Sequence, residues 1–174
     1  MKGQDAVKVD LQRNRLRQVT GISRLSNLTE LNLSRNDLVE FPLEIRQLRS
    51  LGKLYMNQNN IKSIPEGILP SLERLQFLKM STNRLLRLPS DMNTCQSLTY
   101  LNLSNNSLKD LQPLVGLLRL KELYVEKNQL AELPFVLYFS KMVNSTNRTC
   151  NLIWVVETLH STVYMHVVTV MTKY

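Results

Sequence analysis

Hydrophobic residues recur at uneven but repeated intervals along residues 28–48. The apolar positions in this stretch are Leu28, Leu31, Leu33, Leu38, Phe41, Ile45 and Leu48, and Asn36 and Pro42 stand among them. The alternation of Leu31 and Leu33 is typical of a short strand with one buried face. The other apolar positions are spaced too irregularly for a long helix. The stretch therefore predicts a short strand followed by an irregular return.

The same pattern begins again five times. A core of Leu-x-Leu-x-x-Asn-x-Leu, with apolar substitutions only, appears in units that start near residues 6, 28, 51, 75, 98 and 120. The asparagines that anchor the units are Asn14, Asn36, Asn59, Asn83, Asn106 and Asn128, at intervals of 22, 23, 24, 23 and 22 residues. One unit cannot cover both sides of its row of leucines, so neighbouring units must stack. Stacking places the strands in one parallel sheet.

These residues resemble the leucine-rich-repeat family over residues 6–137. The units with Pro42, Pro65, Pro89 and Pro134 are similar to the 23-residue class that is common in intracellular members, and the two 22-residue units resemble the class found in a regulatory subunit of protein phosphatase 1. The resemblance implies an α/β fold. This is a right-handed, horseshoe-shaped solenoid with a concave parallel sheet and short helical or 3₁₀ segments on the convex side. It also implies that the asparagines form a structural ladder, since an amide both donates and accepts.

The repeats predict a domain at residues 1–140 and a divergent tail at residues 141–174. Apolar residues of the tail lie three or four apart, which favours an amphipathic helix that caps the solenoid; these are Leu152, Val156, Leu159, Val163, Val167 and Val170. Many Val and Thr residues there prefer strands instead. A membrane span is disfavoured by Glu157, His160 and His166. An abnormal tail from an alternative transcript is a third interpretation.

Composition adds limits to this interpretation. The chain has 174 residues, of which 43% are hydrophobic and 21% charged, as expected for a globular rather than a disordered protein. Its net charge of +8 favours acidic partners. Only two cysteines occur, and the first residues lack the apolar run of a signal peptide. We therefore expect a cytoplasmic location, or a nuclear one.

Catalytic and metal-binding patterns are not found in the sequence. It has no glycine-rich phosphate loop, no Gly-x-Ser-x-Gly and no His-Glu-x-x-His. The two histidines, His160 and His166, lie six apart in the tail near Cys150, which is no standard metal-ligand spacing. We expect no enzyme activity, no cofactor and no metal.

The strand period turns the residues between the leucines outward on the concave sheet. Aromatic residues gather there on adjacent strands, together with polar ones. Because the family binds proteins through this face, the resemblance implies a partner-binding surface formed by Tyr55, Phe77, Lys79, Tyr100, Asn102 and Tyr124. Rigid amphipathic rings are enriched in interface hot spots. The alternative is that the rings only stack on one another and stabilise the sheet.

Basic residues accumulate beside the sheet. The candidate basic rim comprises Arg13, Arg15, Arg35, Arg84 and Arg87. The rim is either an edge for an acidic partner or an ordinary solvated face. We expect a monomeric interaction module whose partner is a protein, such as a small GTPase, a phosphatase or a scaffold. The alternative function is electrostatic binding of nucleic acid or an acidic membrane surface, although no stacking module or Gly-Arg tract supports it.

Overall fold

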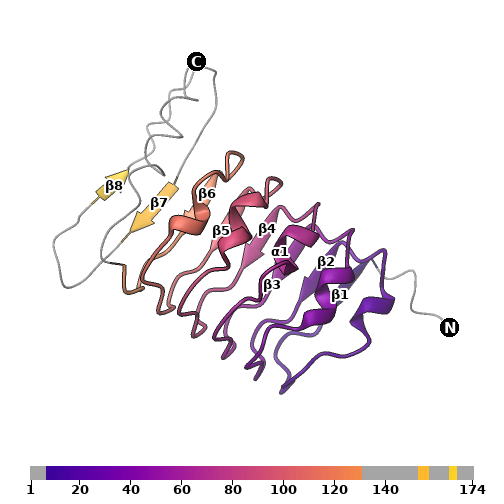
Figure 1. Ribbon diagram of the computed structural model, residues 1–174. Coiled ribbons are helices and arrows are strands. Elements are labelled where there is room, and N and C mark those ends of the chain that lie inside the picture. The colour runs from indigo at the N-terminus through magenta and orange to yellow at the C-terminus, as the bar shows by residue number, and fades with distance from the viewer. Residues whose placement is uncertain (1–6, 131–152, 157–164, 168–174) are drawn as a thin grey trace, which may run out of the picture.

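The computed structural model describes residues 7–130, 153–156 and 165–167. Each of the six units contributes one three-residue strand, and the strands lie side by side in a parallel sheet (Figure 1). They are β1 (Lys8–Asp10), β2 (Glu30–Asn32), β3 (Lys53–Tyr55), β4 (Phe77–Lys79), β5 (Tyr100–Asn102) and β6 (Glu122–Tyr124). The predicted leucine-rich-repeat solenoid is confirmed.

The strands pair without any slip in register. The central residue of each strand aligns with the central residue of the next, so that Leu31, Leu54 and Leu78 form one row. This row is fully buried, as are Leu33 and Met56 one step further along their coils. The outer two residues of each strand face the opposite side of the sheet. The core is therefore formed by leucines of neighbouring coils that pack against one another.

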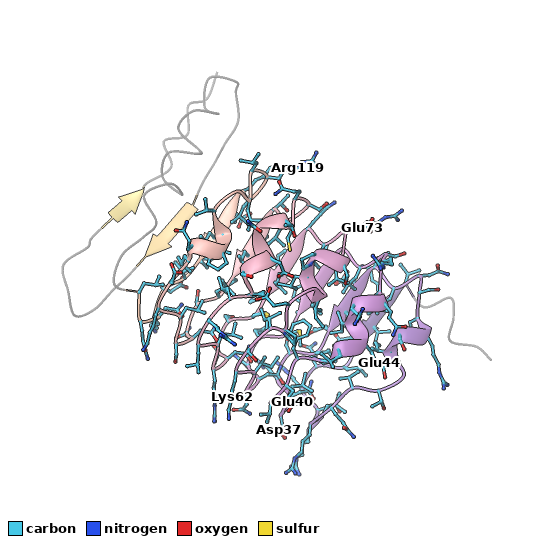
Figure 2. The ribbon with its side chains drawn as sticks, viewed as in Figure 1. Asp37, Glu40, Glu44, Lys62, Glu73 and Arg119 are labelled. Carbon is cyan, nitrogen blue, oxygen red and sulfur yellow. The ribbon has the colours of Figure 1, made fainter. Side chains whose placement is uncertain are left out.

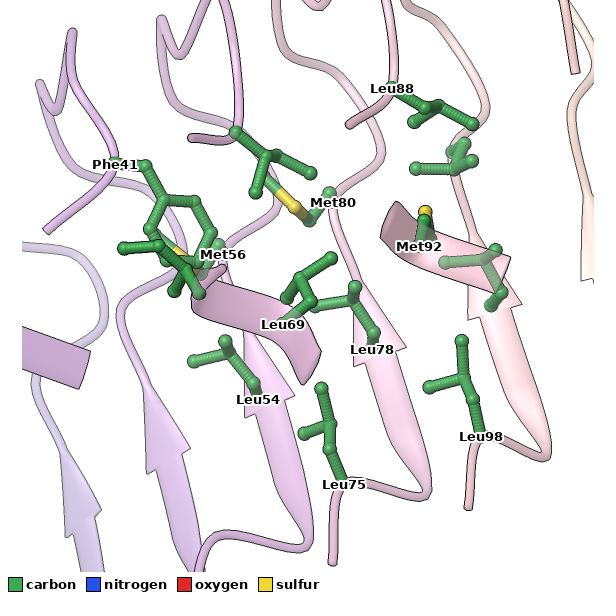
Figure 3. Close-up of a cluster of buried hydrophobic side chains, with 14 of the residues drawn as sticks. Phe41, Leu54, Met56, Leu69, Leu75, Leu78, Met80, Leu88, Met92 and Leu98 are labelled. Carbon is green, nitrogen blue, oxygen red and sulfur yellow. The ribbon is translucent and has the colours of Figure 1, made fainter. Parts of the chain in front are cut away.

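Short helices cover the far side of this core. They are η1 (Ile22–Arg24), η2 (Leu43–Gln47), α1 (Ile68–Ser71), η3 (Ser90–Thr94) and η4 (Gln112–Leu114). Leu69 of α1 and Met92 of η3 pack toward the strands, where they meet Leu54, Leu78 and their neighbours (Figure 3). The third unit has one residue more than its neighbours, and its segment is an α-helical turn where the others are 3₁₀. The extra residue is accommodated on this convex side.

Carboxylates link neighbouring coils on the convex side. Glu44 accepts hydrogen bonds from the backbone N–H and the hydroxyl of Ser23, one coil earlier (3.2 and 2.9 Å). Glu66 accepts from the backbone N–H groups of Ser90 and Asp91, one coil later (2.9 and 3.2 Å). Backbone donors stabilise the ionised form, so they hold the pKa of Glu44 and of Glu66 below its usual value. These bonds give acceptors to backbone N–H groups near the starts of the short helices, which have no partner within the helix.

The anchoring asparagines tie each coil to the one before it. Asn59 donates from Nδ2 to the carbonyl oxygens of Leu33 and Met56 (2.9 and 3.1 Å), and its Oδ1 accepts from the N–H of Leu38 (3.1 Å). Leu33 and Leu38 belong to the preceding coil, while Met56 belongs to the same coil. Asn14 has no described coil before it and donates only within its own. The side chain thus satisfies buried backbone groups that no regular structure pairs.

The residue before each anchoring asparagine has a left-handed backbone. The φ angles lie between 54° and 58° at Arg13, Arg35, Gln58, Thr82, Asn105 and Lys127. The sequence did not indicate this, because none of the six is glycine and their side chains have little in common. Asparagine tolerates this conformation, whereas a β-branched residue such as Thr82 is strained in it. The turn geometry is therefore imposed by the coil rather than by the residue.

The tail differs from the expected capping helix in the parts that the structure describes. There β7 (Ile153–Val156) pairs with β6 in parallel, and β8 (Met165–Val167) pairs with β7 antiparallel. The helix is wrong for these seven residues. Val-rich segments prefer strands, and the outer edge of β6 offers unpaired N–H and C=O groups. The other residues of 141–174 lie outside the described part, and the boundary at residue 140 stays a prediction.

Replacing Asn59 with alanine should cost much more than the same change at Asn14. Asn59→Ala leaves the N–H of Leu38 unpaired in a buried turn, at roughly 1–3 kcal/mol. It also removes one of two donors from the carbonyl oxygens of Leu33 and Met56, which keep Asn36 and Asn83 respectively. We expect the free energy of unfolding to fall by about 2 kcal/mol. Asn14→Ala should cost less than about 1 kcal/mol, because water can replace its exposed bonds. Urea unfolding followed by circular dichroism measures both; equal losses would contradict the ladder.

Relieving the strain at Thr82 should stabilise the protein. Thr82 is exposed and has φ 56°, and Asn105 occupies the same place one coil later with φ 54°. Thr82→Asn is expected to raise the free energy of unfolding by about 0.5–1 kcal/mol. The reciprocal variant, Asn105→Thr, should lower it by a similar amount. Thermal melts of the two variants and the parent test this, and unchanged melting temperatures would refute it.

Candidate functional site

The concave face consists of two rows of outward side chains, one from each end of the strands. The first row holds Lys8, Glu30, Lys53, Phe77, Tyr100 and Glu122, and the second holds Asp10, Asn32, Tyr55, Lys79, Asn102 and Tyr124. Within a row, each residue is the register partner of the next. The sheet therefore presents side chains at the strand spacing, which is about 4.8 Å.

The four predicted aromatic residues form one continuous row of rings, which we call the aromatic row. It crosses between the two rows of side chains, because Phe77 and Tyr100 belong to the first and Tyr55 and Tyr124 to the second. Phe77 and Tyr100 are direct register partners and stack nearly parallel, with ring centroids 4.0 Å apart and planes 9° apart. Tyr55 meets Phe77 at 4.9 Å and 43°, and Tyr124 meets Tyr100 at 5.4 Å and 42°. All four side chains are half-buried. The rings therefore contribute to sheet stability, as the alternative interpretation held, and each still exposes part of its surface.

The polar members of the predicted site lie against this aromatic row. Lys79 and Asn102 are register partners on β4 and β5, and both are half-buried. Asn102 accepts a hydrogen bond at Oδ1 from the backbone N–H of Ser104 (3.1 Å). The side-chain oxygen of Asn102 thus stabilises the turn that follows its own strand. Oδ1 of Asn32 accepts the same bond from the N–H of Ser34 (3.1 Å). The sequence placed Asn102 on the face but did not indicate this local role.

Tyr124 has an acidic neighbour that the sequence analysis did not select. Its hydroxyl donates to Oε2 of Glu122 at 3.1 Å. Burial, and then this bond and the negative charge of Glu122, raise the pKa of Tyr124 to about 12. Residues two apart on a strand share a face, so the pairing could have been found from spacing alone. The phenol is therefore held in its neutral, hydrogen-bonding form.

The predicted basic rim lies where the chain leaves the carboxyl ends of the strands. Its five arginines are all exposed, and none forms an ion pair within the described residues. Arg13 and Arg35 occupy equivalent places in adjacent coils, while Arg84 and Arg87 lie two coils further on. Asp37 and Glu40 project from the same edge as Lys62, opposite Arg119 and Glu73 (Figure 2). The rim residues thus fall in two groups along the sequence, with the third coil between them, and Asp37 and Glu40 belong to the same coil as Arg35.

Other candidate chemistry lies elsewhere or outside the described residues. Cys95 is half-buried against the core, and burial raises the pKa of its thiol to about 12, so it is an unreactive thiol. Within the described part of the chain, no three His, Cys, Asp or Glu side chains gather as metal ligands would. His160 and Cys150 lie outside the described residues.

Comparisons with known proteins match the repeats. A family model described as "Leucine Rich Repeat" matches residues 27–48, and one described as "Leucine Rich repeats (2 copies)" matches residues 96–137. Two Dictyostelium discoideum proteins named probable serine/threonine-protein kinases match short stretches. These are roco9, 50% identical over 48 residues, and pats1, 45% identical over 53. The matches cover 28% and 30% of this chain but only 1% and 2% of those proteins.

Solved structures share the fold over most of the chain. An internalin (inlF) from Listeria monocytogenes superposes with a TM-score of 0.73 at 21% identity, covering 87% of this chain and 41% of that one. A leucine-rich-repeat protein from Leptospira interrogans gives a TM-score of 0.69 at 25% identity, covering 86% and 37%. This chain therefore spans less than half of each matched structure. Within the described residues, no helix is both long enough and apolar enough to span a bilayer.

Titration of Tyr124 should report on its bond to Glu122. The difference in ultraviolet absorbance between the parent and Tyr124→Phe isolates this phenol. Its midpoint should lie near pH 12. In a Glu122→Gln background the midpoint should move part of the way toward the ordinary value of about 10, because burial remains. Since the folded pKa is raised, this stabilising contribution is complete below about pH 10 and is lost as pH rises toward 12. A midpoint near 10 in the parent would contradict the contact.

Proposed function

This chain belongs to the leucine-rich-repeat family, and we propose that it is a non-catalytic interaction module that binds a partner protein through its concave face. The observation that carries the proposal is the continuous row of four half-buried rings across β3 to β6. A scaffold or a regulatory adaptor is the role that we propose for such a module.

Rigidity supports this role. The rings project from strands whose register is fixed on both sides, and they restrain one another by contact. Side chains that are already ordered lose little conformational entropy when a partner binds. Tyrosine also combines a large apolar surface with a hydroxyl, which is why it is common at the centres of interfaces. The concave face is thus prepared for contact with a protein.

The alternative, electrostatic binding of nucleic acid or an acidic membrane, has the net charge of +8 in its favour. The ring geometry argues against the nucleic-acid form. Single-stranded binders offer free ring faces on which bases stack. Here the faces of Phe77 and Tyr100 already cover each other at 4.0 Å. The exposed rim arginines alone give no platform for bases, so we favour a protein partner.

The partner class and the location remain predictions. A small GTPase, a phosphatase or a scaffold in the cytoplasm or nucleus agrees with the family's 23-residue intracellular class, and a monomer is expected. The matched kinases are far longer than this chain, and their names describe them and not this protein.

Removing two rings should abolish partner capture. We expect Tyr55→Ala with Tyr100→Ala to lose the proteins that the parent captures from lysate of the cells that express it, identified by mass spectrometry. A matched control removes two exposed apolar side chains outside the sheet, Leu43→Ala with Leu86→Ala, each 60% exposed in the parent. Thermal melts confirm that both variants are folded at the temperature used. Equal capture by the double tyrosine variant would refute the concave interface.

A further inference from the structure

The middle of the concave face offers hydrogen-bond donors with no acceptors to receive them. Lys79 is half-buried, between its register partners Tyr55 and Asn102. Among the described residues only two ion pairs form, Lys8 with Glu30 (3.1 Å) and Arg49 with Glu73 (3.2 Å). No described carboxylate therefore pairs with the Lys79 ammonium group. A partly desolvated cation without a partner gains when an anion approaches.

The side chain of Asn102, next to Lys79, also has donors that lack an acceptor. Because Oδ1 of Asn102 accepts from Ser104, the orientation of the amide is set by the hydrogen-bond network. Its Nδ2 then carries two N–H donors, and none of them has an acceptor among the described residues. Phe77 and Tyr100 are stacked face to face, so they offer their positively polarised ring edges rather than their negative faces. Ammonium, amide and ring edges thus all favour the same kind of group.

We propose that Lys79 and Asn102 bind the carboxylate of an Asp or Glu side chain of the partner, while apolar residues beside that acid pack on the rings of Tyr55, Phe77 and Tyr100. The inference rests on the proposed concave interface and names the chemistry of its partner. The carboxylate accepts from both the ammonium and the amide, and such charge-assisted bonds are the strong ones. The flanking rings exclude water, which strengthens the attraction.

The charges around the pair favour one carboxylate over a polyanion. Glu122 stands on β6, beside the strand that carries Asn102, and Glu126 follows it. A phosphate group or a nucleic-acid strand would bring further negative charge toward these two residues. The other lysine of the central strands, Lys53, has Glu30 as its register partner. Lys79 is therefore the cation best placed for a single acidic side chain.

Selection of peptides tests this without knowledge of the natural partner. Random twelve-residue peptides displayed on phage are selected on the immobilised full-length chain, with Lys79→Met and Lys53→Met as parallel targets. The parent and Lys53→Met should enrich sequences with one Asp or Glu beside aromatic or aliphatic residues. Lys79→Met should enrich the apolar residues without the acid. Lys53→Met is the matched control, because it removes the same charge from an exposed position one strand away.

A synthetic peptide from the selection gives the magnitude. Changing its acid to the corresponding amide should weaken binding to the parent by about tenfold, as expected for loss of a charge-assisted hydrogen bond, and to Lys79→Met by less than about twofold. Fluorescence anisotropy at two salt concentrations measures both. An equal loss on the two proteins would overturn the role of Lys79. So would displacement of the peptide by a single-stranded oligonucleotide at physiological salt, which would point to nucleic acid instead.

The outcomes separate this inference from the proposed function. If Tyr55→Ala with Tyr100→Ala still binds the selected peptides, the peptides do not use the concave face and the inference is wrong. If that variant loses them while Lys79→Met keeps the preference for an acid, only the role of Lys79 is refuted. If no sequence is enriched, the inference fails as well, and the proposed function still stands or falls on the capture of intact partner proteins.

Discussion

A turning backbone that is cut off from water must have every N–H and C=O group paired, and here one asparagine side chain in each coil pairs groups that the backbone–backbone bonds between coils leave over. Asn59 illustrates the arrangement, since it bonds Leu33 and Leu38 of the preceding coil and Met56 of its own. Neither coil could bury its turn without the other. The leucines supply the hydrophobic driving force for stacking, but the amide determines at which register two coils can stack.

The concave surface follows from that register. Because every strand pairs with the next without a slip, the side chains between the leucines line up in two straight rows. Strands separated by about 4.8 Å bring rings on neighbouring strands into contact, and the observed centroid distances of 4.0–5.4 Å agree with this spacing. The same spacing sets Lys79 beside Asn102. The scaffold is therefore fixed, and the pattern of rings and donors depends only on which residues occupy the outward positions.

The convex side follows looser rules. Units of 22 to 24 residues share one sheet because the difference in length is taken up there, as 3₁₀ turns in most coils and as the α-helical turn α1 in the third. Carboxylates such as Glu44 and Glu66 hold adjacent turns together by accepting backbone hydrogen bonds from the neighbouring coil. The two sides therefore differ. The sheet has a fixed geometry and variable side chains, whereas the convex side has a variable geometry that is held by local hydrogen bonds.

The sequence by itself determined the repeat, the positions of the six repeat strands and the two outward rows, because the period of two and the recurring asparagine leave only one register that buries all the leucines. It also identified the four rings and Lys79 as members of one face. Only the tertiary structure decided what those residues do to one another: that Phe77 and Tyr100 cover each other's faces, and that Asn102 uses its carbonyl oxygen within its own turn. The left-handed turn at Thr82 was hidden because neighbouring coils impose it and no glycine marks it. The helix expected around residues 153–156 was wrong because a local pattern of apolar residues fits either period, and the open edge of β6, which sequence spacing does not reveal, selects the strand.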